Sequence, residues 1–226
     1  MTESERLTSA RKELKMSKFV ITIGRESGAG GPEAARKLSK ALGVEYYNRD
    51  LLKVASEISG INEQLFGKAD ENIGMRHILN AAGKVYTGEV LPPDSDDYTS
   101  TKNLFAFQAK VIKELAENEN CIILGRAGNF LLKGRENVMR VFLHAPLQWR
   151  IENVLRDNEG LGRNEIIKTI NAEDKRRGDY YHYYTGEDWR DARAYDVSID
   201  VSVTGIDETV SRILKLLPVY TDFSET

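Results

Sequence analysis

Short apolar runs alternate with longer stretches of helical spacing along most of the chain. The run CIIL, for example, is apolar throughout, as expected of a strand that is buried on both faces. The stretches between runs repeat their apolar residues every three or four positions, which is typical of helices that pack one side against a core. We expect strands at residues 20–23, 44–47, 121–124, 138–144 and 197–203.

The helical stretches carry start signals. Pro32 and Pro146 each stand where a first helical residue is expected, a position that suits proline because an N–H there would have no intrahelical partner. Asn164 is a candidate N-cap for a long helix. We expect helices at residues 32–42, 49–59, 101–117, 146–155, 165–184 and 207–217, a helix-prone stretch broken by glycines at 61–88, and a surface loop at 91–100.

The alternation of strands and helices predicts the fold class. Parallel strands need crossover helices, so we expect an α/β domain with a parallel sheet and helices on both of its faces. A chain of 226 residues is long enough to bury one such core. Ligands of these folds bind at the carboxyl ends of the strands. The candidate site therefore lies where the segments after residues 23, 124 and 144 meet.

A glycine-rich turn follows the first expected strand. The turn consists of Ser27, Gly28, Ala29, Gly30 and Gly31. Backbone N–H groups of such a turn and the positive end of the next helix converge on an anion, so the turn predicts a phosphate site. The usual phosphate-binding loop ends in a lysine followed by Ser or Thr. Here Gly31 stands at the lysine position, and Pro32 and Glu33 follow it.

Composition narrows the class of protein. A hydrophobic content of 41% and a net charge of −3 are ordinary for a globular protein and argue against a nucleic-acid binder. No apolar stretch approaches the ~20 residues that span a bilayer, and the polar N-terminal region lacks a secretory signal. The single cysteine, Cys121, excludes a disulfide framework. We expect a cytoplasmic protein that binds a small molecule, with no membrane or nucleic-acid partner.

Four segments carry a family resemblance: ITIGRESGAGG, YYNRDLL, IILGRAGN and EDKRRGDYYHYYTGEDWRDARAYDVSIDVS. Together they resemble the cytidylate-kinase-like branch of the P-loop nucleoside monophosphate kinases. The resemblance implies a three-layer P-loop kinase fold with a helical lid, ATP as the donor, Mg²⁺ bound with the nucleotide, and an acceptor such as CMP or dCMP. The chain departs from the kinases at Pro32 and Glu33, and at Ala127, where cytidylate kinases proper carry an aspartate.

The resemblance also divides the chain. We expect residues 1–17 to be an N-terminal extension, either disordered or a short amphipathic helix. Residues 18–217 then form a single kinase-like domain, and 218–226 a C-terminal tail. Within the domain, residues 60–100 are a helical insert and loop, and about 156–193 form the lid.

The nucleotide-binding candidates lie in the loop. Phosphoryl transfer depends on positioning and positive charge, so cations matter most. Arg25 either contacts a phosphate, partly replacing the missing lysine, or forms an ion pair with Glu26 or Glu33. The hydroxyl of Ser27 either binds phosphate or magnesium or belongs to an ordinary turn. With them, Gly28, Ala29, Gly30 and Gly31 complete the predicted donor site.

Charged residues follow two other strands. Arg126 comes directly after a buried strand, where a bidentate guanidinium suits a phosphate or a base carbonyl, although a structural salt bridge is the alternative. Arg49 and Asp50 follow the second strand. They either contact the acceptor nucleotide, or Asp50 caps the helix beginning at residue 51. We therefore name Arg49, Asp50 and Arg126 as substrate-binding candidates.

The stretch 173–189 is the densest group of candidates. On a helix, Arg176 lies four residues before Tyr180, and Glu173 four before Arg177. Arg176 and Arg177 could present guanidiniums from one helix end to the migrating phosphate, and with Arg126 they are the predicted catalytic residues; Tyr180 would bind substrate. The alternative is a solvated charged face. Three aromatic residues either hold the lid down or form a homodimer contact: Tyr183, Tyr184 and Trp189.

Three functions remain open. The first is a nucleotide kinase that uses ATP and Mg²⁺. The second is a catalytically weak or inactive nucleotide-binding regulatory protein on the same fold, which Gly31-Pro32-Glu33 favours. The third is a kinase of a non-nucleotide small molecule. We expect no metal site built from protein ligands, because neither His144 nor His182 has a partner at metal-ligand spacing.

Overall fold

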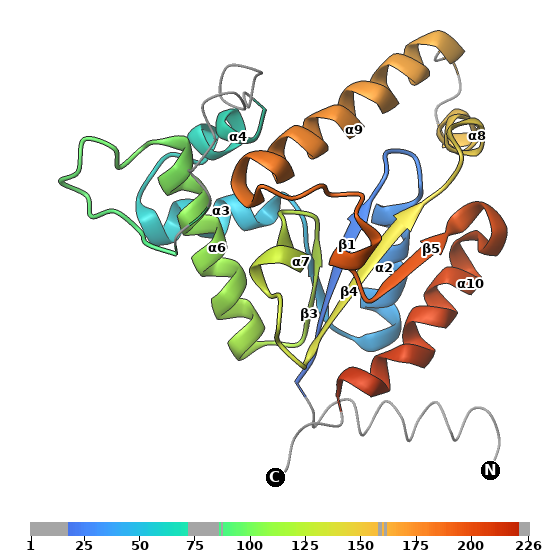
Figure 1. Cartoon of the computed structure of the whole chain (residues 1–226), viewed down its shortest axis with the longest axis horizontal. Helices are drawn as coiled ribbons and strands as arrows, with labels where there is room; N and C mark the ends of the chain where they lie inside the picture. Colours follow the sequence, from blue (N-terminus) through green and yellow to red (C-terminus); the bar gives the residue numbers. More distant parts are fainter. Residues whose placement is uncertain (1–17, 72–85, 87, 158–159, 161, 222–226) are drawn as a thin grey trace.

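The computed structural model describes residues 18–71, 86, 88–157, 160 and 162–221 (Figure 1). The predicted N-terminal extension, much of the helix-prone stretch 61–88, parts of the lid and the end of the tail lie outside these residues. The described residues therefore belong mainly to the predicted kinase-like domain.

A parallel sheet forms the centre of the molecule (Figure 1). Among the described residues it has five strands in the order β2-β3-β1-β4-β5. Neighbouring strands pair in parallel; in β1, Val20 lies opposite Cys121 on one side and Val138 on the other. The strands are β1 (Val20–Arg25), β2 (Glu45–Tyr47), β3 (Cys121–Leu124), β4 (Val138–His144) and β5 (Val197–Asp200). The predicted parallel α/β fold is confirmed.

Helices cover both faces of the sheet, which makes three layers. Successive residues of a strand point to opposite faces, and β1 accordingly sends Val20 into one buried cluster and Ile21 and Ile23 into the other. Helices α2 (Gly31–Leu42) and α10 (Val201–Leu216) cover the second face. The first face is covered by α3 (Asp50–Ser59), α6 (Thr101–Asn118) and α7 (Gly128–Leu131).

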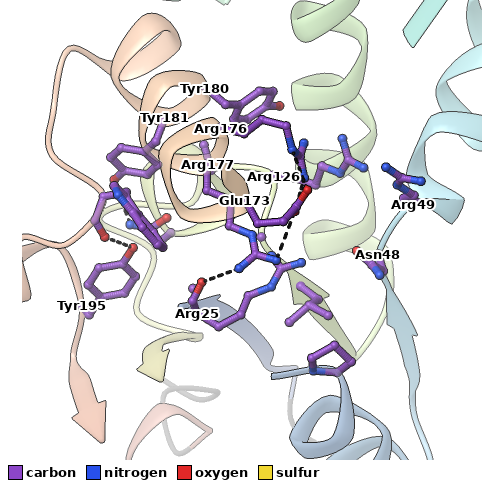
Figure 2. Close-up of a pocket in the computed structure, with 17 residues that line it drawn as sticks. Arg25, Asn48, Arg49, Arg126, Glu173, Arg176, Arg177, Tyr180, Tyr181 and Tyr195 are labelled. Atoms are coloured by element: carbon purple, nitrogen blue, oxygen red, sulfur yellow. Dashed lines mark hydrogen bonds and ion pairs between the residues drawn. The ribbon is translucent and has the colours of Figure 1, made fainter. Parts of the chain in front are cut away.

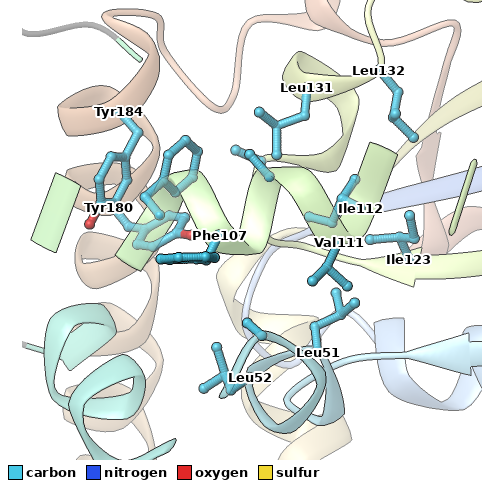
Figure 3. Close-up of a cluster of buried hydrophobic side chains, with 14 of the residues drawn as sticks. Leu51, Leu52, Phe107, Val111, Ile112, Ile123, Leu131, Leu132, Tyr180 and Tyr184 are labelled. Carbon is cyan, nitrogen blue, oxygen red and sulfur yellow. The ribbon is translucent and has the colours of Figure 1, made fainter. Parts of the chain in front are cut away.

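The cluster on the first face continues into the segment predicted to be the lid, which we call the lid below (Figure 3). Tyr184 stacks on Phe105 with ring centroids 3.9 Å apart, and Tyr180 packs edge-on against the same ring. Both tyrosines are buried. Both rings thus pack against α6, which is one of the two roles predicted for Tyr184 but was not predicted for Tyr180.

Two helices follow β4 and lead over the top of the sheet (Figure 1). Helix α8 (Leu147–Asp157) is followed by α9 (Arg163–Thr185), and the chain returns through the 3-10 turn η1 (Ala192–Ala194) to β5. Helix α4 (Glu63–Glu71) lies in the predicted insert, and the 3-10 turn η2 (Leu217–Tyr220) ends the described chain. Among the described residues, no helix is both long and apolar enough to cross a membrane.

Several predicted boundaries were wrong. The last strand ends at Asp200, not 203, because the Asp200 side chain accepts a hydrogen bond from the N–H of Ser202 at 2.9 Å and starts a helix there. Gly205 interrupts that helix with a φ of 69°. Helix α9 begins at Arg163, so Asn164 is not its cap. The four-residue α7 was not predicted, since it is too short to show a period.

Candidate active site

The glycine turn has the predicted form. Gly28 and Gly30 adopt left-handed φ values of 81° and 78°, which favour glycine, and α2 begins directly afterwards at Gly31. The N–H groups of a first helical turn have no intrahelical partner, so those of Gly31 and Glu33 remain available to an anion. Pro32 has no N–H to offer. The turn and the helix end therefore present the N–H donors that the predicted anion site requires, with one donor fewer than usual.

Arg25 lies in a narrow slot between two glycines. A Cβ atom on Gly31 would stand 2.6 Å from Cγ and 3.0 Å from Cβ of Arg25, and one on Gly125 would collide with its Nη1 atom. The stem of Arg25 thus crosses the lysine position of the loop, and its guanidinium reaches the turn after β3. Its Nε atom is buried and makes no hydrogen bond. The guanidinium of Arg25 therefore contains a buried N–H donor, Nε, for which the protein supplies no acceptor.

The predicted ion pairs of Arg25 with Glu26 or Glu33 are wrong. Glu26 instead approaches Arg190 at 3.0 Å and Arg150 at 3.5 Å, and Glu33 pairs with Lys37 at 3.0 Å. The carboxylates next to Arg25 in sequence are turned toward other cations.

A cavity of about 300 Å³ opens beside the loop, at the carboxyl edge of the sheet (Figure 2). Among the described residues, five arginines from four parts of the chain line it: Arg25 at the end of β1, Arg49 before α3, Arg126 after β3, and Arg176 and Arg177 on α9. These last two lie in the middle of α9 and not at its end as predicted. Segments far apart in sequence thus bring their cations to one place.

The turn that carries Arg126 has an unusual backbone. Gly125, Arg126 and Ala127 adopt φ values of 81°, 59° and 51°. A left-handed conformation costs a non-glycine residue about 1–2 kcal/mol. Arg126 also donates a hydrogen bond to the buried hydroxyl of Tyr180. The strained turn and the tyrosine together fix the guanidinium at the cavity wall.

The cavity is electrostatically unbalanced. Burial, together with the nearby charges of Arg177 and Arg126, lowers the pKa of Arg25 to about 9. Burial likewise lowers the pKa values of Arg126 and Arg177. These groups are still cations at neutral pH, so the shifts reflect how strongly the site favours an incoming anion.

Glu173 is the single carboxylate among the described residues that line the cavity. It accepts a hydrogen bond from Arg176 at 2.8 Å and lies 3.7 Å from Arg177. The hydrogen bond from Arg176 holds the pKa of Glu173 below its usual range. Glu173 thus orients the two lid arginines and leaves the cavity with a large excess of positive charge.

The opposite wall of the cavity is aromatic. Tyr195 donates its hydroxyl proton to the carbonyl of Trp189 at 2.7 Å, and Asn129 donates to the hydroxyl of Tyr181 at 2.9 Å. Tyr195 packs on Gly24, where a Cβ would lie 2.8 Å from its hydroxyl. The hydrogen bonds therefore fix the positions of the rings in this wall of the cavity, while the arginines supply the charge.

A buried ion pair supports the loop from the outside. Arg150 on α8 and Asp174 on α9 lie 2.6 Å apart, and the side chains of both are 7% exposed. Asp174 accepts from the N–H of Ser27 at 2.7 Å, and Arg150 donates to the carbonyl of the same residue at 2.9 Å. Asn153 donates to the carbonyl of Gly28 at 2.9 Å. The lid helices are thereby attached to the glycine turn.

The structure places most predicted site residues together. Arg25, Arg49, Arg126, Arg176, Arg177 and Tyr180 all line the cavity. Ser27 to Gly31 form the adjoining loop and do not line it. Asp50 is exposed, lies outside the lining and is the first residue of α3, so the cap predicted for a helix beginning at residue 51 is wrong.

Sequence reasoning missed other residues of the site. Asn48 lines the cavity and directly precedes Arg49, so its position after β2 was an available signal. The pairing of Arg150 with Asp174 had no such signal, because it joins two helices through tertiary packing.

Among the described residues, no group of three or more His, Cys, Asp and Glu side chains could hold a metal ion.

Comparison with known proteins agrees with this geometry. The family described as the cytidylate kinase-like family matches residues 20–203, most of the chain. The chain belongs to this family. The resemblance predicted from the four sequence segments is therefore confirmed.

Individual relatives point the same way. A protein of Methanopyrus kandleri named cytidylate kinase is 27% identical over 205 residues, which cover 87% of this chain and 91% of the relative. A cytidylate kinase of Methanosarcina mazei is 31% identical over 83 residues, or 36% of this chain and 46% of its own. An uncharacterized protein from Eubacterium ventriosum shares the fold, with a TM-score of 0.65, 22% identity, and coverage of 89% of this chain and 99% of that chain.

Proposed function

We propose that this family member is an ATP-dependent phosphotransferase that transfers the γ-phosphate of ATP to a nucleoside monophosphate such as CMP or dCMP. The observation that carries the proposal is the convergence of five guanidiniums, among the described residues, on one cavity beside a glycine turn. A cavity with this excess of positive charge suits a phosphorylated ligand. The family and its relatives named cytidylate kinase support the same class of reaction.

The site divides into two parts under this proposal. The N–H groups at the start of α2 hold the donor phosphates, and the arginines of the cavity hold the acceptor phosphate and the phosphate in transfer. In the transfer, an oxygen of the acceptor phosphate bonds to the γ-phosphorus while the bond to the β,γ-bridging oxygen breaks and ADP leaves. A phosphate acceptor needs no base, so the protein's task is positioning and charge stabilisation.

Magnesium would reach this site with the nucleotide. The described residues offer no carboxylate cluster for it, and Pro32 stands where a hydroxyl ligand is usual. Such a setting fits Mg²⁺ held mainly by phosphate oxygens and water. When bound, it would neutralise charge on the donor phosphates.

The residues that line the cavity do little to select the base of the acceptor nucleotide. Trp189, Tyr181 and Tyr195 offer flat surfaces on which any planar base could stack. Ala127 supplies no hydrogen bond where cytidylate kinases proper carry an aspartate. CMP and dCMP are thus the first acceptors to test, followed by other nucleoside monophosphates and by phosphorylated or hydroxylated small molecules.

A second candidate function is a regulatory nucleotide-binding protein that turns over poorly. Gly31, Pro32 and Glu33 favour it, because they remove the usual cation, one N–H donor and the usual hydroxyl from the loop. Under this alternative the chain binds nucleotide but does not transfer phosphate.

One pair of measurements separates the candidates. A coupled assay would follow ADP release with ATP, Mg²⁺ and each acceptor in turn, and calorimetry would measure ATP binding. Acceptor-dependent ADP release supports the kinase. Binding of ATP without release at high enzyme concentration supports the regulatory protein, and absence of both binding and release refutes both.

A further inference from the structure

The slot that holds Arg25 suggests how this loop manages without a lysine. The stem of Arg25 crosses over Gly31, and its head lies against Gly125. Both neighbours are glycines, and in both cases a side chain would occupy the space that Arg25 fills. The arginine is therefore accommodated along its whole length, from the loop to the turn after β3.

We propose that Arg25 is the catalytic cation of the phosphate-binding loop, and that Arg25 and a lysine at position 31 are sterically exclusive alternatives. This inference rests on the proposed function and deepens it. The cation comes from the end of β1 and reaches the donor–acceptor junction through the place where a lysine stem would begin. Gly31 is glycine because any side chain there would meet Cγ and Cβ of Arg25, at 2.6 and 3.0 Å.

The clash involves the first atoms of the Arg25 side chain. Cβ is fixed by the backbone of β1, and Cγ moves only by rotation about the Cα–Cβ bond, which would carry the whole guanidinium out of its slot. Gly31 itself lies in the first turn of α2 without a left-handed φ, so backbone conformation does not demand glycine there. The steric role of Arg25 is thus separable from any backbone effect.

The unsatisfied Nε atom supports a ligand role for Arg25. It is buried and lacks a hydrogen-bond partner, whereas Glu26 and Glu33 are engaged by other cations. An arginine placed for stability would be expected to use its donors within the protein. The protein therefore does not hold this part of Arg25 by a hydrogen bond of its own, and since Arg25 lines the cavity, a bound phosphate would meet the cavity side of the guanidinium.

The test is a set of five variants assayed for ADP release, with thermal unfolding measured for each. Arg25→Met keeps the stem and removes the charge, while Arg25→Ala removes the charge and every stem atom beyond Cβ, including the Cγ that makes the 2.6 Å contact. Each is also combined with Gly31→Lys, and Gly31→Lys is made alone. Arg36→Ala, which removes an exposed arginine of α2 outside the cavity, is the charge-matched control.

The expected pattern depends on both charge and space. Arg25→Met and Arg25→Ala should each lower kcat about 10²–10³-fold, the usual effect of deleting one stabiliser of transition-state charge, without loss of thermal stability. Gly31→Lys should then restore kcat at least about 10-fold in the Arg25→Ala background, where the lysine stem has room. It should restore nothing in the Arg25→Met background, where the stem is retained, and should bring no gain when made alone. Arg36→Ala should keep the kcat of the wild type.

Three other outcomes would overturn the inference about Arg25 and would leave the proposed kinase function standing. These are near-wild-type kcat in Arg25→Ala, equal rescue in the Met and Ala backgrounds, or a loss of thermal stability that accounts for the lost activity. If the wild type itself releases no ADP, the proposed function fails, and the inference is decided by the dissociation constant of ATP. In that case the inference requires that Arg25→Ala weaken ATP binding about 10-fold, and that Gly31→Lys restore ATP binding only in the Arg25→Ala background. Unchanged ATP binding in Arg25→Ala overturns the inference.

Discussion

Asp174 and Arg150 form a buried ion pair, 2.6 Å apart, that joins α9 to α8 and binds both backbone groups of Ser27. One carboxylate and one guanidinium thus connect the lid to the glycine turn. Because Arg190 also approaches Asp174 at 3.2 Å, a third segment of the lid is attached to the same carboxylate. The geometry of the loop therefore depends on residues about 120 to 150 positions away in sequence.

Replacing Asp174 by Asn should destabilise the fold strongly. The change leaves the buried charge of Arg150 with only Glu26 near it, and removing one partner of a buried pair costs about 3–5 kcal/mol. Urea denaturation measures this loss in the free energy of unfolding. The matched control is Glu208→Gln, which breaks an exposed pair with Arg212 and should cost less than about 1 kcal/mol. Equal losses in both variants would contradict a structural role for the buried pair.

Gly125→Ala should impair activity beyond its cost to the backbone. Gly125 has a φ of 81°, and a Cβ there would also displace the head of Arg25. Gly60 has a φ of 70° and nothing within 4 Å of an added Cβ, so Gly60→Ala shares the backbone strain alone. Both should lose about 1–2 kcal/mol of stability from the left-handed backbone. We expect kcat to fall about 10²-fold in Gly125→Ala only. The same kcat in both variants would contradict the claim that the guanidinium of Arg25 needs the space beside Gly125.

Glu173→Gln should separate binding from turnover. The variant removes the carboxylate that orients Arg176 and Arg177 but adds net positive charge to the cavity. We expect a lower KM for the acceptor, together with a kcat that is about 10-fold lower. Steady-state kinetics over a range of acceptor concentrations would reveal this split. An increase in KM at unchanged kcat would show that Glu173 itself binds the acceptor.

The same residue should give the protein an acid-sensitive contribution to stability. The hydrogen bond from Arg176 lowers the pKa of Glu173 from its ordinary value of 4.5. Its contribution is therefore fully present above pH 4.5 and is lost as pH falls through the lower pKa of the folded protein. Below pH 4.5, the unfolding free energy of the wild type should decline more steeply than that of Glu173→Gln. Parallel pH profiles of the two proteins would contradict this.

Trp189 should report on occupation of the cavity. It lines the site and lies 4.9 Å from the guanidinium of Arg190, whereas Trp149, the second tryptophan of the chain, packs near Arg156 on α8. In Trp149→Phe, titration with CMP should change the remaining tryptophan emission. In Trp189→Phe the change should be absent. A signal that follows Trp149 instead would place the bound ligand elsewhere.

Much of the fold followed from local patterns. The strands of residues 121–124 and 138–144 were predicted at their observed bounds, since continuous apolar runs are strong signals for buried strands. The end of β5 was mistaken because Val201 and Val203 favour strands, while the helix cap of Asp200 determines the outcome. Local propensity was overruled there by one side-chain hydrogen bond.

The site was predictable to the extent that it depends on strand ends. Arg25, Arg49 and Arg126 each follow a strand or end one, so the topology of a parallel sheet was enough to bring them together. The left-handed turn at Arg126 and Ala127, the slot around Arg25 and the support of the loop by Asp174 were not predictable. They arise from contacts among segments that only the folded chain brings side by side.

The central claim is that gathered guanidiniums replace the absent lysine on the migrating phosphate. The most direct test is a crystal structure of the protein with ADP, Mg²⁺, CMP and tetrafluoroaluminate, a planar mimic of the group in transfer. We predict that the mimic lies about 3 Å from the guanidinium of Arg25 and from at least one of Arg126, Arg176 and Arg177. A mimic bound with all four guanidiniums turned away from it would contradict the claim.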